Sequence, residues 1–187
     1  MMQHTDHRGS KATNHSRPIK NQQTSRLDFD AYKAGLTLLA RRELSAAQLR
    51  TRLLQKTMEP KAIELAILRL KKEGALDDHR MAMAYTRQSI NLKQRGPNRV
   101  AQELEARGVD RGTALSAIKA VFTDYDTKAV LEHALKRRLT GSITNRSEFR
   151  RLYQYLIRQG FDPDLIVNTL RTKSRSETLP SKAESEN

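Results

Sequence analysis

The feature that most constrains the fold is a pattern that occurs three times along the chain, at intervals of 51 and 52 residues. In each copy an apolar residue is followed, four positions later, by a small or polar residue. An apolar and an acidic residue come next, and two more apolar residues continue at helical spacing. The aligned sets are Leu53/Leu104/Leu156, Thr57/Gly108/Gly160, Met58/Val109/Phe161, Glu59/Asp110/Asp162, Ile63/Ala114/Ile166 and Ile67/Ile118/Leu170. This pattern indicates a helix that ends at a turn, followed by a helix whose positive N-terminal end carries an acid.

The sequence around the middle copy predicts that each copy belongs to a three-helix unit. Asp78 is expected to cap a helix that runs to about Gln94, because a carboxylate can accept a bond from a free N–H of the first turn. Gly96 is expected to end that helix in a left-handed conformation, and Pro97 to begin the next one. The predicted fold is therefore all-α, with three tandem three-helix repeats in an elongated, curved array.

The predicted boundaries follow from these units. We expect a disordered basic tail over residues 1–27, repeats over 28–76, 77–123 and 124–172, and a frayed C-terminal tail over 173–187. The first helix is expected to begin after Asp28 or Asp30. Its buried face would carry Phe29, Tyr32, Leu36 and Leu39, which recur at helical spacing.

The charge of the chain favours a polyanionic partner. The formal net charge is +14, and residues 28–171 hold 27 Lys or Arg against 17 Asp or Glu, so most of the excess lies in the predicted repeats. Positive charge spread over a folded array is typical of proteins that bind nucleic acid, although a solvated surface explains it too. The sequence has no cysteine and no apolar run near the ~20 residues of a membrane span. We expect a cytoplasmic monomer without a membrane contact.

No catalytic pattern is present. The eight glycines are scattered among predicted turns and form no phosphate loop, and no metal-ligand or nucleophile motif occurs. The carboxylates gather at predicted helix starts, where capping explains them, as at Asp110. Ser45 and Asn145 are also expected to cap helices. We expect no enzyme activity, no cofactor and no metal site, and favour a binding or regulatory role.

Four stretches resemble the RecX family of bacterial regulators of the RecA recombinase. They are ARRELS at 40–45, EGALDDHRMA at 73–82, RGPNRV at 95–100 with RGV at 107–109, and YLIRQGF at 155–161. Each motif is weak alone, but their order and spacing are specific and together they span most of residues 30–171. Met81 stands where the family usually has an aromatic residue, and Gln94 where it often has a glycine.

The resemblance implies a function. RecX-like proteins bind the RecA filament along its groove and restrain filament growth, ATP hydrolysis, strand exchange and co-protease stimulation, and they are not enzymes. The implied partner is the RecA filament, and we also expect weak contact, without sequence preference, with single- and double-stranded DNA. The candidate filament or DNA contacts are Arg41, Arg42, Arg87, Arg95, Arg99, Arg146, Arg150 and Arg151.

Two other functions stay open. The chain could be a basic helix-turn-helix array that binds DNA directly, with the third helix of each repeat in the groove. The acids at the starts of those helices, including Glu59 and Asp162, disfavour it because they would face phosphates. The chain could also be an interaction solenoid that contacts only proteins.

Overall fold

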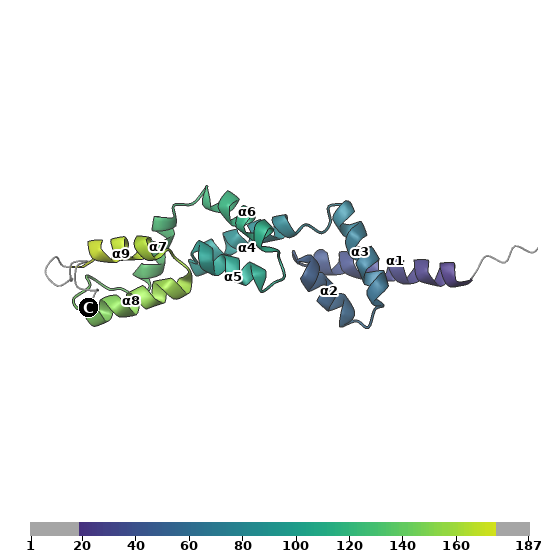
Figure 1. Cartoon of the computed structure of the whole chain (residues 1–187), viewed down its shortest axis with the longest axis horizontal. Helices are drawn as coiled ribbons and strands as arrows, with labels where there is room; N and C mark the ends of the chain where they lie inside the picture. The colour runs from purple at the N-terminus through teal and green to yellow at the C-terminus, as the bar shows by residue number, and fades with distance from the viewer. Residues whose placement is uncertain (1–18, 175–187) are drawn as a thin grey trace, which may run out of the picture.

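The structure, a computed structural model, describes residues 19–174, with side chains from Phe29 onward. Within that range nine helices and no strand form three groups of three along one long axis (Figure 1). The helices are α1 (Ile19–Leu39), α2 (Ala46–Leu54), α3 (Pro60–Lys72), α4 (Asp78–Lys93), α5 (Pro97–Glu105), α6 (Arg111–Phe122), α7 (Thr127–Lys136), α8 (Arg146–Gln159) and α9 (Pro163–Thr172). The all-α fold with tandem three-helix repeats is confirmed. The tail predictions for residues 1–18 and 175–187 lie outside the described residues.

Each repeat buries an apolar cluster of its own. Leu49, Leu53 and Ile63 are fully buried in the first, and Leu104 and Ala114 in the second. The third cluster also takes in Ile90 from α4, so the second and third repeats share part of one core. Thin clusters of this kind bury enough surface because neighbouring repeats cover one another.

The first helix differs from the prediction at its start and on its buried face. It begins at Ile19, because no glycine or proline interrupts the sequence from there to Asp28. Phe29 is 47% exposed and Leu36 is 36% exposed, whereas Ala31 is fully buried. At Gly35 a Cβ would lie 2.7 Å from Leu70 Cδ1. The helix therefore approaches α3 closely through small residues. Tyr32 and Leu39 are half-buried against the same cluster, as predicted, whereas Phe29 and Leu36 are not.

Most of the predicted helix caps are confirmed, with one shift. Ser45, Asp110, Asn145 and Asp162 all accept bonds from first-turn amides. The cap of α4 is Asp77, and not Asp78 as predicted: Asp77 Oδ1 accepts from His79 N at 2.8 Å and from Arg80 N at 3.0 Å. Both residues are aspartates, so the sequence did not distinguish them.

Asp78 instead joins the first two repeats. Its Oδ1 accepts a hydrogen bond of 2.7 Å from Ala46 N, an unpaired donor at the start of α2. Ser45 Oγ, also at this helix start, donates to the carbonyl of Arg107 at 2.5 Å. The start of α2 thus lies against the turn between α5 and α6.

The second and third repeats meet in the same way. Gly96, the N-cap of α5, donates its N–H to the Gln159 carbonyl at 2.9 Å, and Asn98 N donates to Gly160 O at 3.1 Å. Gly96 and Gln159 stand at the positions that Ser45 and Arg107 occupy one repeat earlier. At each junction, the start of one repeat's second helix therefore lies on the turn that follows the second helix of the next repeat.

Gly96 is needed for this contact and not for a left-handed cap, which corrects the prediction. Its φ is −79°, whereas Gln94 ends α4 with a φ of 47°. A Cβ on Gly96 would overlap the Gly160 carbonyl, and a Cβ on Gly160 would overlap Arg99. A backbone contact of this kind fixes the distance between two repeats.

Candidate functional site

Two of the predicted contact arginines share one carboxylate as their ion-pair partner. Glu103, on α5, forms ion pairs with Arg95 and with Arg99, whose Nε lies 3.0 Å from Glu103 Oε1. The Tyr85 hydroxyl donates to Glu103 Oε2 at 2.6 Å. The side chain of Glu103 is only 14% exposed, so little water competes for these partners. Arg95 and Arg99 therefore have an acidic partner within the protein, and the three side chains together keep one net positive charge.

A basic cavity of about 570 Å³ lies next to this cluster, between the first two repeats. Arg42, Tyr85, Lys93 and Arg107 line it, and we call it the junction cavity. The Arg107 guanidinium lies over the Tyr85 ring at 4.0 Å from its centre, and Lys93 Nζ lies 5.5 Å from the same centre. Cations are thus crowded around one aromatic ring.

The crowding leaves the junction cavity suited to an anion. Desolvation lowers the pKa of Lys93, and the charges of Arg95 and Arg107 lower that pKa further. The carboxylate in the lining, Glu43, pairs with Arg80 at 2.9 Å. An added phosphate or carboxylate would relieve the repulsion among the cations.

A second hollow, of about 390 Å³, lies on the third repeat between α8 and α9. We call it the repeat-3 groove. Its residues include three arginines and three apolar or aromatic side chains: Arg146, Arg150, Arg171, Phe149, Tyr153 and Val167. Arg146 and Arg150 share a face of α8 because they are four residues apart, and Arg171 reaches the groove from α9. No carboxylate lines this groove.

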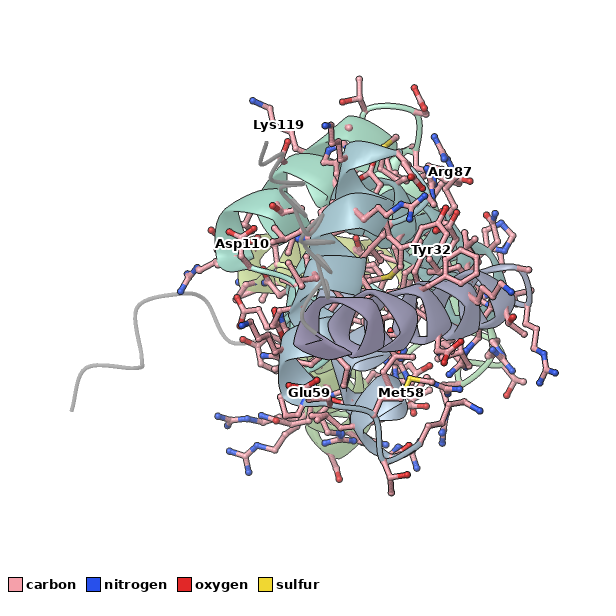
Figure 2. The ribbon with its side chains drawn as sticks, turned by 90° about the vertical axis from the view of Figure 1, so that its right-hand side faces the viewer. Tyr32, Met58, Glu59, Arg87, Asp110 and Lys119 are labelled. Atoms are coloured by element: carbon pink, nitrogen blue, oxygen red, sulfur yellow. The ribbon has the colours of Figure 1, made fainter. Side chains whose placement is uncertain are left out.

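The remaining predicted contacts lie apart from the groove. Arg41 and Arg87 are exposed, and Arg151 lies 3.8 Å from Glu148. Viewed along the long axis, Arg87 points to the same side as Tyr32, and Asp110 to the opposite side (Figure 2). The structure therefore brings Arg146 and Arg150 together, places Arg42 in the junction cavity and pairs Arg95 and Arg99 internally.

Sequence reasoning missed three cationic residues of these sites, namely Lys93, Arg107 and Arg171. Their positions near helix ends suggest capping of the negative dipole, which hid them as ligands. Only the meeting of α4 and α5 with the first repeat, and of α8 with α9, shows that they face cavities. Tyr85 and Tyr153 gave no separate signal, because helical spacing assigns such residues to the core.

These features define a class: an all-α array of three-helix repeats with basic, partly aromatic cavities between and within the repeats. The chain belongs to the RecX family of regulatory proteins. Residues 31–70 match the family's first three-helix domain, and residues 77–118 match its second three-helix domain.

Relatives and solved structures agree with that membership. The regulatory protein RecX of Halorhodospira halophila is 34% identical over 135 residues, covering 71% of this chain and 81% of the relative. The RecX of Treponema pallidum is 30% identical over 149 residues, covering 78% of this chain and 87% of the relative. The crystal structure of RecX from Lactobacillus salivarius superposes with a TM-score of 0.67 at 21% identity, covering 79% of this chain and 99% of that one. A second crystal structure of a regulatory protein RecX gives a TM-score of 0.69 at 21% identity, covering 82% and 76%. Within residues 19–174 no helix has the length and apolarity that crossing a membrane requires.

Proposed function

We propose that the protein binds the RecA–DNA filament and inhibits filament growth, and with it ATP hydrolysis, strand exchange and co-protease stimulation by RecA. The observation that carries the proposal is membership of the RecX family, supported by 34% identity to the Halorhodospira halophila regulatory protein. In this proposal the protein acts as a monomer in the cytoplasm, has no enzyme activity and contacts DNA weakly.

The shape and the charges of the array support this role. Three groups of helices follow one another along the long axis (Figure 1), so a single molecule can contact several neighbouring subunits of a filament. The junction cavity and the repeat-3 groove present cations from different repeats. A nucleoprotein filament offers acidic groups at repeated intervals, which fits cations that are spaced along a rod.

Direct DNA binding by a helix-turn-helix array is disfavoured by the third helices of the repeats. Asp110 and Asp162 lie at the starts of α6 and α9 and accept bonds from amides there. In a helix-turn-helix protein the N-terminal part of the recognition helix meets the base edges. Carboxylates fixed at that point would repel the neighbouring phosphates.

Binding measurements to three targets separate these roles. The protein is titrated into fluorescently labelled duplex DNA, into free RecA, and into RecA assembled on single-stranded DNA with a non-hydrolysable nucleotide. Filament regulation predicts the tightest binding to the assembled filament. Equal binding to bare duplex and filament would contradict it and favour the helix-turn-helix array. Binding to free RecA alone would identify a protein-interaction solenoid.

A further inference from the structure

The repeat-3 groove has three guanidinium groups without acidic partners. Arg146, Arg150 and Arg171 are exposed, and within residues 19–174 none of them forms an ion pair. Arg95 and Arg99, by contrast, both form ion pairs with Glu103. Three unpaired guanidiniums around one hollow predict an anionic ligand, because guanidinium groups bind phosphate and carboxylate with matched geometry.

The floor of the groove is aromatic and only half-buried. Phe149 and Tyr153 lie one turn apart on α8, and Val167 contributes from α9. Both aromatic residues pack against the core of the third repeat, and part of each side chain faces the groove. Accessible rings next to arginines form the combination on which single-stranded nucleic acids bind, with bases on the rings and phosphates on the cations.

The size and the backbone of the groove distinguish between anionic ligands. A hollow of about 390 Å³ accepts a small planar group such as one base. The bases of a duplex cannot enter it, because they are stacked inside the double helix. An acidic peptide would find no strand edge here, since both walls are helices.

We propose that the repeat-3 groove is a subsite for single-stranded nucleic acid, in which one unstacked base lies on Tyr153 and Phe149. The phosphates on either side of that base contact Arg150, Arg146 and Arg171. This inference deepens the DNA contact in the proposed function and does not depend on RecA.

The test measures binding of the full chain to labelled oligothymidylate by fluorescence anisotropy over a range of salt concentrations. Oligothymidylate is chosen because its bases stack weakly on one another. Tyr153→Leu removes the ring and keeps the charge, so we expect affinity to fall roughly five-fold or more with an unchanged salt slope. Arg150→Ala should lower the salt slope of log K by ~0.7, as one phosphate contact is lost from a single strand.

Matched variants make the result specific to the groove. Tyr153→Phe keeps the ring and should bind like the parent. Arg158→Ala removes one exposed cation from the same helix outside the groove, and should leave the slope closer to the parent value than Arg150→Ala does. Thermal unfolding followed by circular dichroism shows whether each variant stays folded.

Five results would overturn the inference. Tyr153→Leu could bind like the parent, or Arg150→Ala and Arg158→Ala could act equally, which would mean diffuse charge. Competition by an acidic peptide but not by unlabelled oligothymidylate would identify a protein ligand, and equal competition by free thymidine monophosphate would identify a mononucleotide site. If the parent did not bind oligothymidylate at all, the DNA contact would also be removed from the proposed function. If the parent bound it but the groove variants had no effect, only the groove assignment would fail and the proposed function would stand.

Discussion

Gly96 and Gly160 lie backbone to backbone, and neither has room for a Cβ. The amide of Asn98 donates to the Gly160 carbonyl at 3.1 Å, and Gly96 N–H donates to the carbonyl that precedes Gly160. The relative position of the second and third repeats therefore depends on the absence of two side chains. Position 160 also has a φ of 87°, which glycine adopts without strain.

Gly96→Ala should destabilise the junction. Its methyl group would overlap the Gly160 carbonyl, so we expect the free energy of unfolding to fall by about 1–3 kcal/mol, the usual cost of overpacking. Urea denaturation measures the loss, and small-angle scattering should show a change in the length of the rod. Gly112→Ala is the control, because the nearest atom there is the side chain of Asp110 at 3.2 Å. Equal effects of the two variants would contradict this account of the junction.

Thr57→Gly should stabilise the protein. Thr57 stands where Gly108 and Gly160 occur in the other repeats and shares their left-handed backbone, with a φ of 57°. Thr57 is exposed, and within residues 19–174 no earlier repeat packs against this turn, so a side chain fits. The left-handed conformation nevertheless costs a branched residue about 1–2 kcal/mol. Glycine loses more conformational freedom on folding, by about 0.5–1 kcal/mol, and the bond from Thr57 Oγ1 to the Lys56 carbonyl disappears.

The net gain from Thr57→Gly is therefore below about 1 kcal/mol. A rise in the urea midpoint with an unchanged m-value would confirm it. A fall in that midpoint would mean that the hydroxyl bond outweighs the backbone strain.

Asp77 should contribute to the fall in the free energy of unfolding at acidic pH. Bonds from the backbone amides of Arg80 and His79 lower the pKa of Asp77. A carboxyl with a lower pKa in the folded state stabilises the protein fully above its unfolded pKa of about 3.9, and the contribution is lost as pH falls through the folded value. Asp77→Ala should cost about 1 kcal/mol at neutral pH, as for a lost N-cap.

Asp77→Asn separates the cap from its titration. Asparagine still accepts an amide bond but does not ionise, so stability at neutral pH should stay near that of the parent while the slope between pH 5 and the acid transition becomes shallower. Urea midpoints measured across this pH range supply the comparison. If the urea midpoints of the parent and of the Asn variant fell identically with decreasing pH, other carboxyl groups would cause the loss of stability in acid.

Glu103→Gln should weaken the fold and strengthen DNA binding. The change keeps the shape but removes the negative charge with which Arg95 and Arg99 both pair. We expect a loss of about 1.5–3 kcal/mol, since these bonds are charged and partly buried. Two guanidiniums become available to phosphates, so the salt slope of duplex binding should steepen by up to ~0.9 for each.

Glu64→Gln is the matched control for Glu103→Gln. Glu64 pairs with Arg50 at 2.5 Å, but both side chains are about half exposed, and such pairs contribute about 0–1 kcal/mol. If both variants lose the same stability and neither changes the salt slope, the Glu103 cluster has no special role.

The sequence predicted the helices better than the way they meet. The repeat, the Ser45 and Asp110 caps and the turns at Gly108 and Gly160 follow from local rules and were confirmed. The predicted buried face of α1 was right for Tyr32 and Leu39 and wrong for Phe29 and Leu36, because small residues allow a closer approach that apolar spacing does not reveal. Asp78 and Gly96 were given local roles, whereas each serves a neighbouring repeat across the chain.

The candidate site was predicted in part for a related reason. Listing arginines identified Arg146 and Arg150, which the structure brings together. It also included Arg95 and Arg99, since the sequence does not show that Glu103 lies between them in space. Lys93, Arg107 and Arg171 were missed because each becomes a cavity residue only when helices from different parts of a repeat, or from two repeats, are packed.

The most direct test of the proposed function is ATP hydrolysis by RecA on single-stranded DNA, with this protein added at increasing substoichiometric ratios. We expect the rate of hydrolysis to fall at well below one molecule per RecA, because control of filament growth affects many subunits at once. An unchanged rate at equal concentrations, together with tight binding to bare DNA, would contradict filament regulation and support the helix-turn-helix array.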